Sequence, residues 1–139
     1  FEEGYRARAY YCSERYPTIG IGTKLGPKNA PLDAYTFTVS RETAKSFLVD
    51  EVSENQRKLA GCSWWNKCND ARKTILLSMC YQLGFNGLLK FKRMIRAIKA
   101  DDWDLVALEA LDSRWAKQTP ARAGRVCRVI AGGSIGVSY

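Results

Sequence analysis

Short-range alternation of apolar and polar residues marks the beginning of the chain, whereas the rest repeats apolar residues at helical spacing. In the segment 7–21, tyrosines and isoleucines lie on both sides of the polar run 12–15, which predicts a β-hairpin. Gly20 and Gly22 interrupt its second strand and indicate a bend or a close approach of another backbone. After a loop containing glycine and proline, residues 35–39 predict a third, short strand.

Helical patterns dominate the remaining sequence. Ser40 is a suitable N-cap for a helix that ends near Leu59, before Gly61. Residues 70–83 are apolar on nearly every side and are followed by Gly84, which is typical of a central, buried helix. Shorter helices are expected over 88–100, 103–111, 113–117 and 120–130.

This order of elements predicts an α+β fold with a small N-terminal β-hairpin or sheet lobe and a larger helical C-terminal lobe. We expect one domain over 1–139, with a β-rich lobe at about 1–40, a connecting helix at about 41–60 and a helical lobe at about 61–139. A length of 139 residues with 46% hydrophobic content suits one compact domain. No run approaches the roughly 18 apolar residues of a membrane span. The first residues carry no signal-peptide pattern. Because the sequence starts at Phe1 rather than at a methionine, we expect a leader, a tag or part of a larger protein to precede it.

An excess of basic residues, 22 against 14 acidic ones, gives a formal charge of +8 and favours anionic partners. Nucleic acid and an anionic cell wall fit this charge equally well. The basic residues are spread along the sequence rather than gathered in one run of five or six, and no zinc spacing, recognition helix or aromatic RNA-binding motif is present. Charge alone therefore leaves the partner open.

Five cysteines occur in a chain without histidine: Cys12, Cys62, Cys68, Cys80 and Cys127. Their spacing lacks the paired Cys-x-x-Cys units of structural zinc, so no metal is expected. Cys62 and Cys68 bracket a five-residue segment and predict a short disulfide loop. An odd count leaves at least one thiol without an internal partner, and Cys80 and Cys127 are either a second bridge or small buried side chains.

Three residues near the N-terminus carry candidate chemistry: Glu3, Cys12 and Thr18. Cleavage of a glycosidic bond needs a proton donor and a second group that stabilises or attacks the sugar cation or activates water. A hairpin that folds back over a helix end could bring all three residues to one cleft wall. By spacing alone, a solvated glutamate and an ordinary strand threonine are the more common explanations of this pattern.

Several stretches, in order and across nearly the whole chain, resemble the phage-type lysozymes of the T-even kind. They are Glu3-Gly4 with Tyr10, the run Tyr16-Pro17-Thr18-Ile19-Gly20-Ile21-Gly22, the segment Met79-Cys80-Tyr81-Gln82-Leu83-Gly84 with Phe91 and Trp103, and the C-terminal pair Ser113-Arg114-Trp115 and Gln118-Thr119-Pro120-Ala121-Arg122-Ala123. The resemblance implies a lysozyme-like fold and hydrolysis of bacterial peptidoglycan.

The resemblance also implies roles for individual residues. Glu3 would be the general acid, and Thr18 would position water or the sugar. Arg122 would pair with Glu3; because a nearby cation lowers the pKa of a carboxyl group, burial must compensate if Glu3 is to stay protonated. The glycan would be bound by Tyr81, Gln82, Gln118 and Thr119, for which ordinary packing or surface positions are the alternative.

Two positions depart from the family pattern. Cys12 stands where the family has an aspartate, and Thr23 where a histidine commonly follows the Thr-Ile-Gly-Ile-Gly run. A thiolate is a strong nucleophile, so we expect Cys12 to be catalytic. The alternatives are that Glu14 takes this role or that activity has been lost. The family also has more of the helix that precedes Glu3, which puts the position of Glu3 in doubt.

The sequence thus predicts an endo-acting N-acetylmuramidase that needs no metal or cofactor and acts on bacterial peptidoglycan outside the cytoplasm. It would be either a host-lysis endolysin or a virion-associated lysozyme within a larger virion protein or assembly. The rival prediction is a non-catalytic peptidoglycan-binding module. A nucleic-acid partner is not expected.

Overall fold

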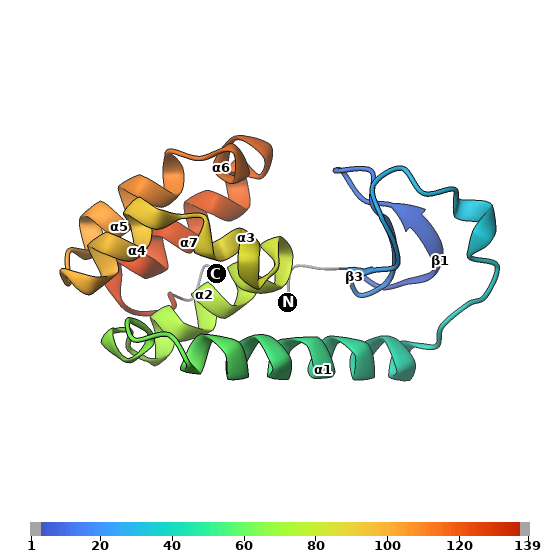
Figure 1. Cartoon of the computed structure of the whole chain (residues 1–139), viewed down its shortest axis with the longest axis horizontal. Coiled ribbons are helices and arrows are strands. Elements are labelled where there is room, and N and C mark those ends of the chain that lie inside the picture. Colours follow the sequence, from blue (N-terminus) through green and yellow to red (C-terminus); the bar gives the residue numbers. More distant parts are fainter. Residues whose placement is uncertain (1–3, 137–139) are drawn as a thin grey trace. The chain divides into compact units, whose positions relative to one another are not determined.

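The structure, a computed structural model, describes residues 4–136 and has an α+β fold (Figure 1). Three short strands come first and helices make up most of the remaining chain, which confirms the predicted fold class. The chain divides into two compact units, residues 1–53 and residues 54–139. We refer to them as the N-terminal unit and the helical unit.

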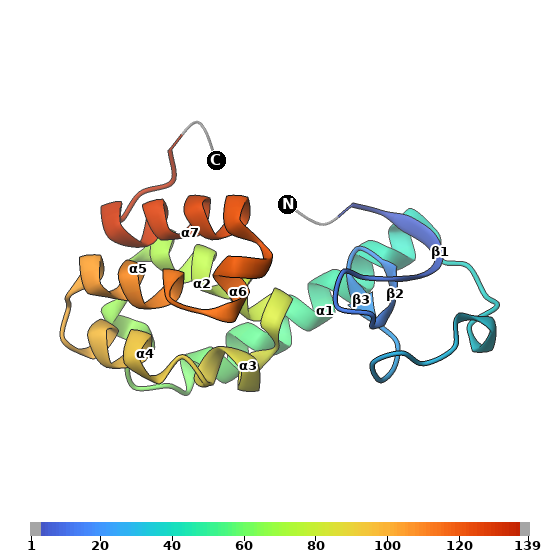
Figure 2. The same cartoon turned by 90° about the horizontal axis from the view of Figure 1, so that it is seen from above.

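An antiparallel sheet forms the centre of the N-terminal unit, with the strand order β1-β2-β3 (Figure 2). Its strands are β1 (Arg6–Tyr11), β2 (Pro17–Gly20) and β3 (Thr23–Lys24). The hairpin predicted over 7–21 is therefore confirmed. In the central strand, Thr18 lies opposite Tyr10 on one side and Lys24 on the other.

The face of the sheet opposite to the Thr18 side chain packs on a small apolar core. Ile19, Val39 and Ala44 are its buried members, and Tyr5, Ile21 and Leu25 pack against it. Gly20 has a φ of 68°, and a Cβ atom at this position would lie 3.0 Å from the Cβ atom of Ala44. It would also lie 3.4 Å from the Cα atom of Ala44, so of the two alternatives, a bend or a close approach of another backbone, the structure shows the close approach at this glycine.

The third strand was expected in the wrong place. Residues 35–39 come after the 3-10 helix η1 (Leu32–Ala34), and within them only Thr38 forms a β-bridge, with Arg8. Phe37 is 48% exposed, so the alternating aromatic pattern does not reflect burial on one face. Val39 alone enters the core, and the strand that completes the sheet is the two-residue β3.

Helix α1 (Arg41–Ala60) begins where the sequence predicted. The hydroxyl oxygen of Ser40 accepts a hydrogen bond of 3.1 Å from the backbone N–H of Thr43, which satisfies one of the free donors at the helix start. The boundary between the two units falls inside this helix, after Ser53.

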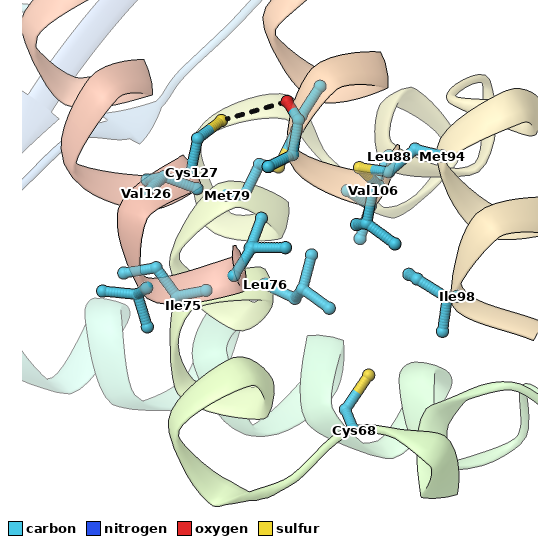
Figure 3. Packing of buried hydrophobic residues seen from close by; sticks show 14 of the residues in the cluster. Cys68, Ile75, Leu76, Met79, Leu88, Met94, Ile98, Val106, Val126 and Cys127 are labelled. Atoms are coloured by element: carbon cyan, nitrogen blue, oxygen red, sulfur yellow. Dashed lines mark hydrogen bonds between the residues drawn. The ribbon is translucent and has the colours of Figure 1, made fainter. Parts of the chain in front are cut away.

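The helical unit is built around one large apolar core to which every helix from α2 to α7 contributes (Figure 3). The helices are α2 (Asp70–Leu83), α3 (Phe85–Leu89), α4 (Lys92–Lys99), α5 (Trp103–Leu111), α6 (Arg114–Gln118) and α7 (Pro120–Gly132), with the 3-10 helix η2 (Trp65–Lys67) before them. Helix α2 has the predicted bounds and buries residues on several sides, among them Ile75, Leu76 and Met79. It is the central helix that the sequence indicated.

The prediction of a single helix over 88–100 is wrong, because the helical conformation is interrupted between α3 and α4. Lys90 and Phe91 donate backbone hydrogen bonds to Gly87 and Leu88, three residues earlier, so the last turn of α3 tightens and ends. Phe91 then leaves the helical conformation, with a ψ of 62°, and its ring makes an edge contact with Trp115 at 6.3 Å. This aromatic packing accompanies the helix break.

Candidate active site

Cys12 lies at the start of the hairpin turn, directly after β1. Its backbone N–H donates to the carbonyl oxygen of Tyr16 (3.0 Å), and its own carbonyl accepts from the N–H of Arg15 (2.9 Å). Arg15 has a φ of 67°, a conformation that a tight turn imposes. Asn29 braces the turn from the next loop, since its N–H donates to the carbonyl of Arg15 (2.8 Å) and its side-chain oxygen accepts from the Arg15 guanidinium (3.3 Å).

Thr18 is 2% exposed in the central strand, and its hydroxyl group donates to the same carbonyl oxygen of Tyr16 at 2.9 Å. One carbonyl therefore accepts from both Cys12 and Thr18. With its proton committed to Tyr16, the Thr18 oxygen keeps lone pairs that can accept a hydrogen bond from water or a sugar hydroxyl. The structure thus brings the backbone of Cys12 and the side chain of Thr18 to one carbonyl group of the N-terminal unit.

Aromatic and basic side chains surround this point. Because Tyr10, Thr18 and Lys24 lie opposite one another in adjacent strands, their side chains share one face of the sheet. The Lys24 ammonium lies 4.5 Å from the ring centre of Tyr16, and the Arg6 guanidinium 4.6 Å from that of Tyr10. Such faces combine aromatic surfaces with hydrogen-bond donors, which suits polar ligands such as sugars.

The thiol of Cys12 is more accessible than the three buried thiols of the chain, as is that of Cys62. Cys12 is partly exposed, whereas Cys68, Cys80 and Cys127 are buried. Burial raises the pKa of both Cys68 and Cys127 to about 11, so these side chains stay protonated near neutral pH. A thiolate nucleophile must be reachable by its substrate, a condition that Cys12 and Cys62 both meet. Of these two, only Cys12 belongs to the hairpin, and burial raises the pKa of the Cys62 thiol.

The predicted glycan-binding residues belong to the helical unit, and two of them are held by Trp115. The indole N–H of Trp115 donates to the side-chain oxygen of Gln82 (2.9 Å), and the backbone carbonyl of Trp115 accepts from the hydroxyl of Thr119 (2.9 Å). Trp115 itself is 4% exposed. The fixed amide of Gln82 keeps its NH₂ group as a donor. The sequence placed Trp115 in a motif, but it gave no sign that this residue orients its neighbours.

The other residues predicted for this unit occupy different environments. Tyr81 is buried near the end of α2, Gln118 is exposed at the end of α6, and Arg122 is half-buried on α7. Tyr81 and Arg122 each interact with another group of the protein. Glu3 lies outside the described residues, so its pairing with Arg122 stays a prediction.

Glu14, the alternative to Cys12, is half-buried within the hairpin turn that Cys12 begins. It makes no ion pair among the residues that the structure describes. The alternative therefore stays open.

The disulfide predicted between Cys62 and Cys68 is wrong, because both are free thiols. The Cys62 thiol faces the carbonyl oxygen of Lys58 (3.8 Å), at the end of α1. The Cys68 side chain instead points into the core of the helical unit (Figure 3). Two consecutive turns in the backbone, from Cys62 to Trp65 and from Trp65 to Cys68, separate the two residues.

Cys80 and Cys127 are also free and buried, which decides between the two alternatives for them in favour of small core side chains. The thiol of Cys127 donates to the carbonyl oxygen of Ala107 (3.5 Å; Figure 3). Over residues 4–136, no group of three or more histidine, cysteine or acidic residues could hold a metal ion. Over the same residues, no helix has the length and apolar character needed to cross a membrane.

Comparison with known proteins places these features in a family. The model of the family described as phage lysozyme matches residues 1–132. The chain is similar to the Pre-baseplate central spike protein Gp5 of Enterobacteria phage T4, with 29% identity over 96% of this chain and 27% of that protein. It is also similar to Probable T4-type lysozyme 2 of Dictyostelium discoideum, with 28% identity over 97% of this chain and 92% of that protein.

A further relative is Peptidoglycan hydrolase gp36 of Pseudomonas phage phiKMV, 28% identical over 87% of this chain and 13% of that protein. The chain thus spans about a quarter of the T4 spike protein, a smaller part of the phiKMV protein, and nearly the whole of the Dictyostelium protein. Because the family model covers nearly all of its length, the chain belongs to the phage lysozyme family, a family of glycosidases.

Proposed function

We propose that the chain is an endo-acting N-acetylmuramidase that hydrolyses the β-1,4 bond between N-acetylmuramic acid and N-acetylglucosamine in bacterial peptidoglycan. Family membership supports the reaction class, and the names of the Dictyostelium and phiKMV relatives support the substrate. The observation that carries the proposal is the Tyr16 carbonyl, which accepts from the backbone of Cys12 and from the hydroxyl of Thr18.

In the proposed reaction, the bond between the anomeric carbon and the glycosidic oxygen breaks, and Glu3 donates a proton to the departing oxygen. The thiolate of Cys12 attacks or stabilises the anomeric carbon. Water then attacks the anomeric carbon and releases the Cys12 thiolate from any carbon–sulfur bond that has formed. One proton of the water returns to Glu3, and the remaining hydroxyl group completes the product. Thr18, whose own proton is held by Tyr16, accepts a hydrogen bond from the water or the sugar.

The helical unit supplies binding groups in this proposal. Gln82 and Thr119, both held by Trp115, present polar atoms for sugar hydroxyls and acetamido groups. We assign the same role to Tyr81 and Gln118. Arg122 pairs with Glu3 and keeps it in position, and burial of the carboxyl group offsets the lowering of its pKa by the guanidinium.

The substrate sets where the enzyme works, which is outside the cytoplasm, at the host wall or on a virion. Similarity to the T4 spike protein favours a lysozyme part of a larger virion protein, and the near full-length match to the Dictyostelium protein favours a free lysozyme, as an endolysin would be. No metal or cofactor has a role in the proposed reaction.

A peptidoglycan-binding module without catalysis is the second candidate, favoured by one observation. In the resemblance described above, Cys12 stands at the position of an aspartate, so this chain would lack the second catalytic carboxylate. A binding module would sediment with cell walls and release no reducing ends from them.

The test measures the release of reducing ends from purified walls by the wild type and by Glu3→Gln. The amide of glutamine cannot donate the proton, so the variant should lose at least about 100-fold in rate while its circular dichroism spectrum is unchanged. If the wild-type protein releases no reducing ends from the walls, the result would favour the binding module. A Glu3→Gln variant with near wild-type rate would remove Glu3 from the mechanism.

A further inference from the structure

Helix α4 and the residue pair before it carry a dense group of exposed cations. We call Lys90, Lys92, Arg93, Arg96 and Lys99 the α4 basic face. All five side chains are exposed. Lys92, Arg96 and Lys99 succeed one another at spacings of four and three residues, so they lie on one side of the helix over about 10 Å of its length.

These cations are not neutralised from within the unit. The sequence from 71 to 100 contains no aspartate or glutamate. Asp101, the first acidic residue after α4, pairs instead with Lys67 at 3.6 Å, and Asp102 accepts from the N–H of Leu105 as the cap of α5. Among the described residues, no ion pair or side-chain hydrogen bond engages the α4 basic face.

The opposite side of α4 is committed to the core. Met94, Ala97 and Ile98 are buried there and Ile95 is half-buried against the same core, so the helix exposes little apolar surface to insert into a lipid bilayer. Lysine is depleted at protein–protein interfaces, and those interfaces are enriched in aromatic anchors that the exposed positions of this helix lack. The face therefore suits a flexible polyanion, which contacts charges one by one along its length.

The N-terminal unit has no net charge, whereas the helical unit is strongly positive. Residues 1–53 contain 7 basic and 7 acidic residues, whereas residues 54–139 contain 15 basic and 7 acidic residues. The whole excess of +8 therefore belongs to the helical unit. One third of the basic residues of that unit lie within the ten positions of the α4 basic face.

We propose that the α4 basic face binds the phosphate-rich anionic polymers of the bacterial cell wall and holds the enzyme at its substrate by contacts outside the catalytic residues. The choice of wall polymers as the source of phosphate rests on the proposed function, whereas the capacity to bind a polyphosphate chain does not. Repeated phosphates along a flexible chain match repeated exposed cations along a helix.

A pair of triple variants tests this proposal. Lys92→Gln, Arg96→Gln and Lys99→Gln together remove three charges from the α4 basic face. The matched control replaces Arg8, Lys28 and Lys45 of the N-terminal unit by glutamine, which also removes one arginine and two lysines, all exposed and without an ion pair in the described part of the chain. Both variants carry the same net charge.

Binding is measured by co-sedimentation with purified walls, before and after acid extraction of their phosphate polymers, and by titration with inorganic polyphosphate. At 50 mM NaCl, the wild type and the control should prefer unextracted walls by at least about tenfold, and the α4 variant should lose that preference. For polyphosphate, the slope of log affinity against log salt should fall by about 2 in the α4 variant. Release of reducing ends from extracted walls, measured alongside, should be the same for all three proteins.

Equal weakening of the two triple variants would overturn the proposal, because net charge rather than the α4 basic face would then explain binding. Retained preference of the α4 variant for unextracted walls would overturn it too. So would displacement of the wild type from walls by duplex DNA at a lower phosphate concentration than by polyphosphate, which would indicate a nucleic-acid partner. Absence of reducing ends from extracted walls would instead contradict the proposed hydrolysis and leave the binding result interpretable.

Discussion

The N-terminal unit and the helical unit differ in how much apolar surface supports them. In the N-terminal unit, the buried core consists of Ile19, Val39 and Ala44, with a few half-buried neighbours. The core of the helical unit draws on every helix from α2 to α7. The candidate catalytic residues Cys12 and Thr18 belong to the unit with the smaller core, where backbone hydrogen bonds in a hairpin hold them.

The two units also differ in charge, since the N-terminal unit is neutral and the helical unit carries the whole excess. The absence of any single run of five or six basic residues concealed this division. The difference teaches that chemistry and attraction to anionic polymers need not arise from the same part of the chain. Each can then be altered without the other.

The largest expected effect on stability concerns the two cores. Leu76→Ala, at a fully buried position of α2, should lower the free energy of unfolding by about 2–5 kcal/mol and unfold the helical unit at a lower temperature. Ile19→Ala removes a side chain that is equally buried, but its cost should appear mainly as faster hydrogen exchange in β1 and β2. Both variants are compared with the wild type by thermal unfolding and by hydrogen exchange.

If Ile19→Ala accelerates exchange in α2 and α7 as much as in the sheet, the two units unfold together. The contrast between their cores would then have no consequence for local stability.

Much of the fold was predicted from local signals. The N-cap at Ser40, the bounds of α2 and α5 and the strands of the hairpin all depend on residues close together in sequence. The misplaced third strand and the break at Phe91 depend on distant partners, namely Arg8 of β1 and Trp115 of α6. Periodicity within a segment carries no information about such partners.

The next effect distinguishes the thiols of the two units. With pKa values of about 11, Cys68 and Cys127 of the helical unit have about one thousandth of their thiol in the reactive form at pH 8. Cys12 of the N-terminal unit is partly exposed and should be alkylated first by iodoacetamide. Cys62 is also partly exposed, but burial raises its pKa, so it should follow Cys12 and precede the two buried thiols. Peptide mass mapping over a time course checks this order, and equal rates at Cys12 and Cys68 would contradict it.

The same raised pKa values predict a loss of stability in alkali. A thiol whose pKa is higher in the folded state stabilises the fold fully below its ordinary value, near 9, and this contribution is lost as pH rises towards 11. The melting temperature should therefore fall less between pH 9 and 11 in Cys68→Ala than in the wild type. Parallel curves for the two proteins would show that the Cys68 thiol does not contribute.

The smallest expected effect on stability comes from the loss of a helix cap, and one cap from each unit is compared. Ser40→Ala removes the cap of α1 and should cost about 1 kcal/mol. Ser113→Ala should cost more, up to about 2 kcal/mol, because this half-buried hydroxyl caps α6 and also donates to the carbonyl of Ala110. Ser46→Ala, inside α1, is the control and should change stability little. Chemical denaturation gives the three values, and an equal cost for Ser40 and Ser113 would remove the expected difference.

The candidate site was predicted less completely than the fold. The motif at 16–22 identified Thr18, and the departure from the family pattern identified Cys12. The shared carbonyl of Tyr16 could not be found this way, because a backbone acceptor leaves no residue-type signal. The disulfide between Cys62 and Cys68 was predicted wrongly, because their short spacing in the sequence gave no information on where their side chains point.

The most direct test of the central claim, that Cys12 performs the second catalytic function, compares Cys12→Asp with Cys12→Ser in the rate of reducing-end release from purified walls. Aspartate restores a carboxylate and should keep substantial activity, whereas serine should lose at least about 100-fold, because a hydroxyl group is neither charged nor nucleophilic enough near neutral pH. All three side chains are similar in size, so folding should be unaffected. A serine variant as fast as the wild type would contradict the claim and transfer the role to Glu14 or to water.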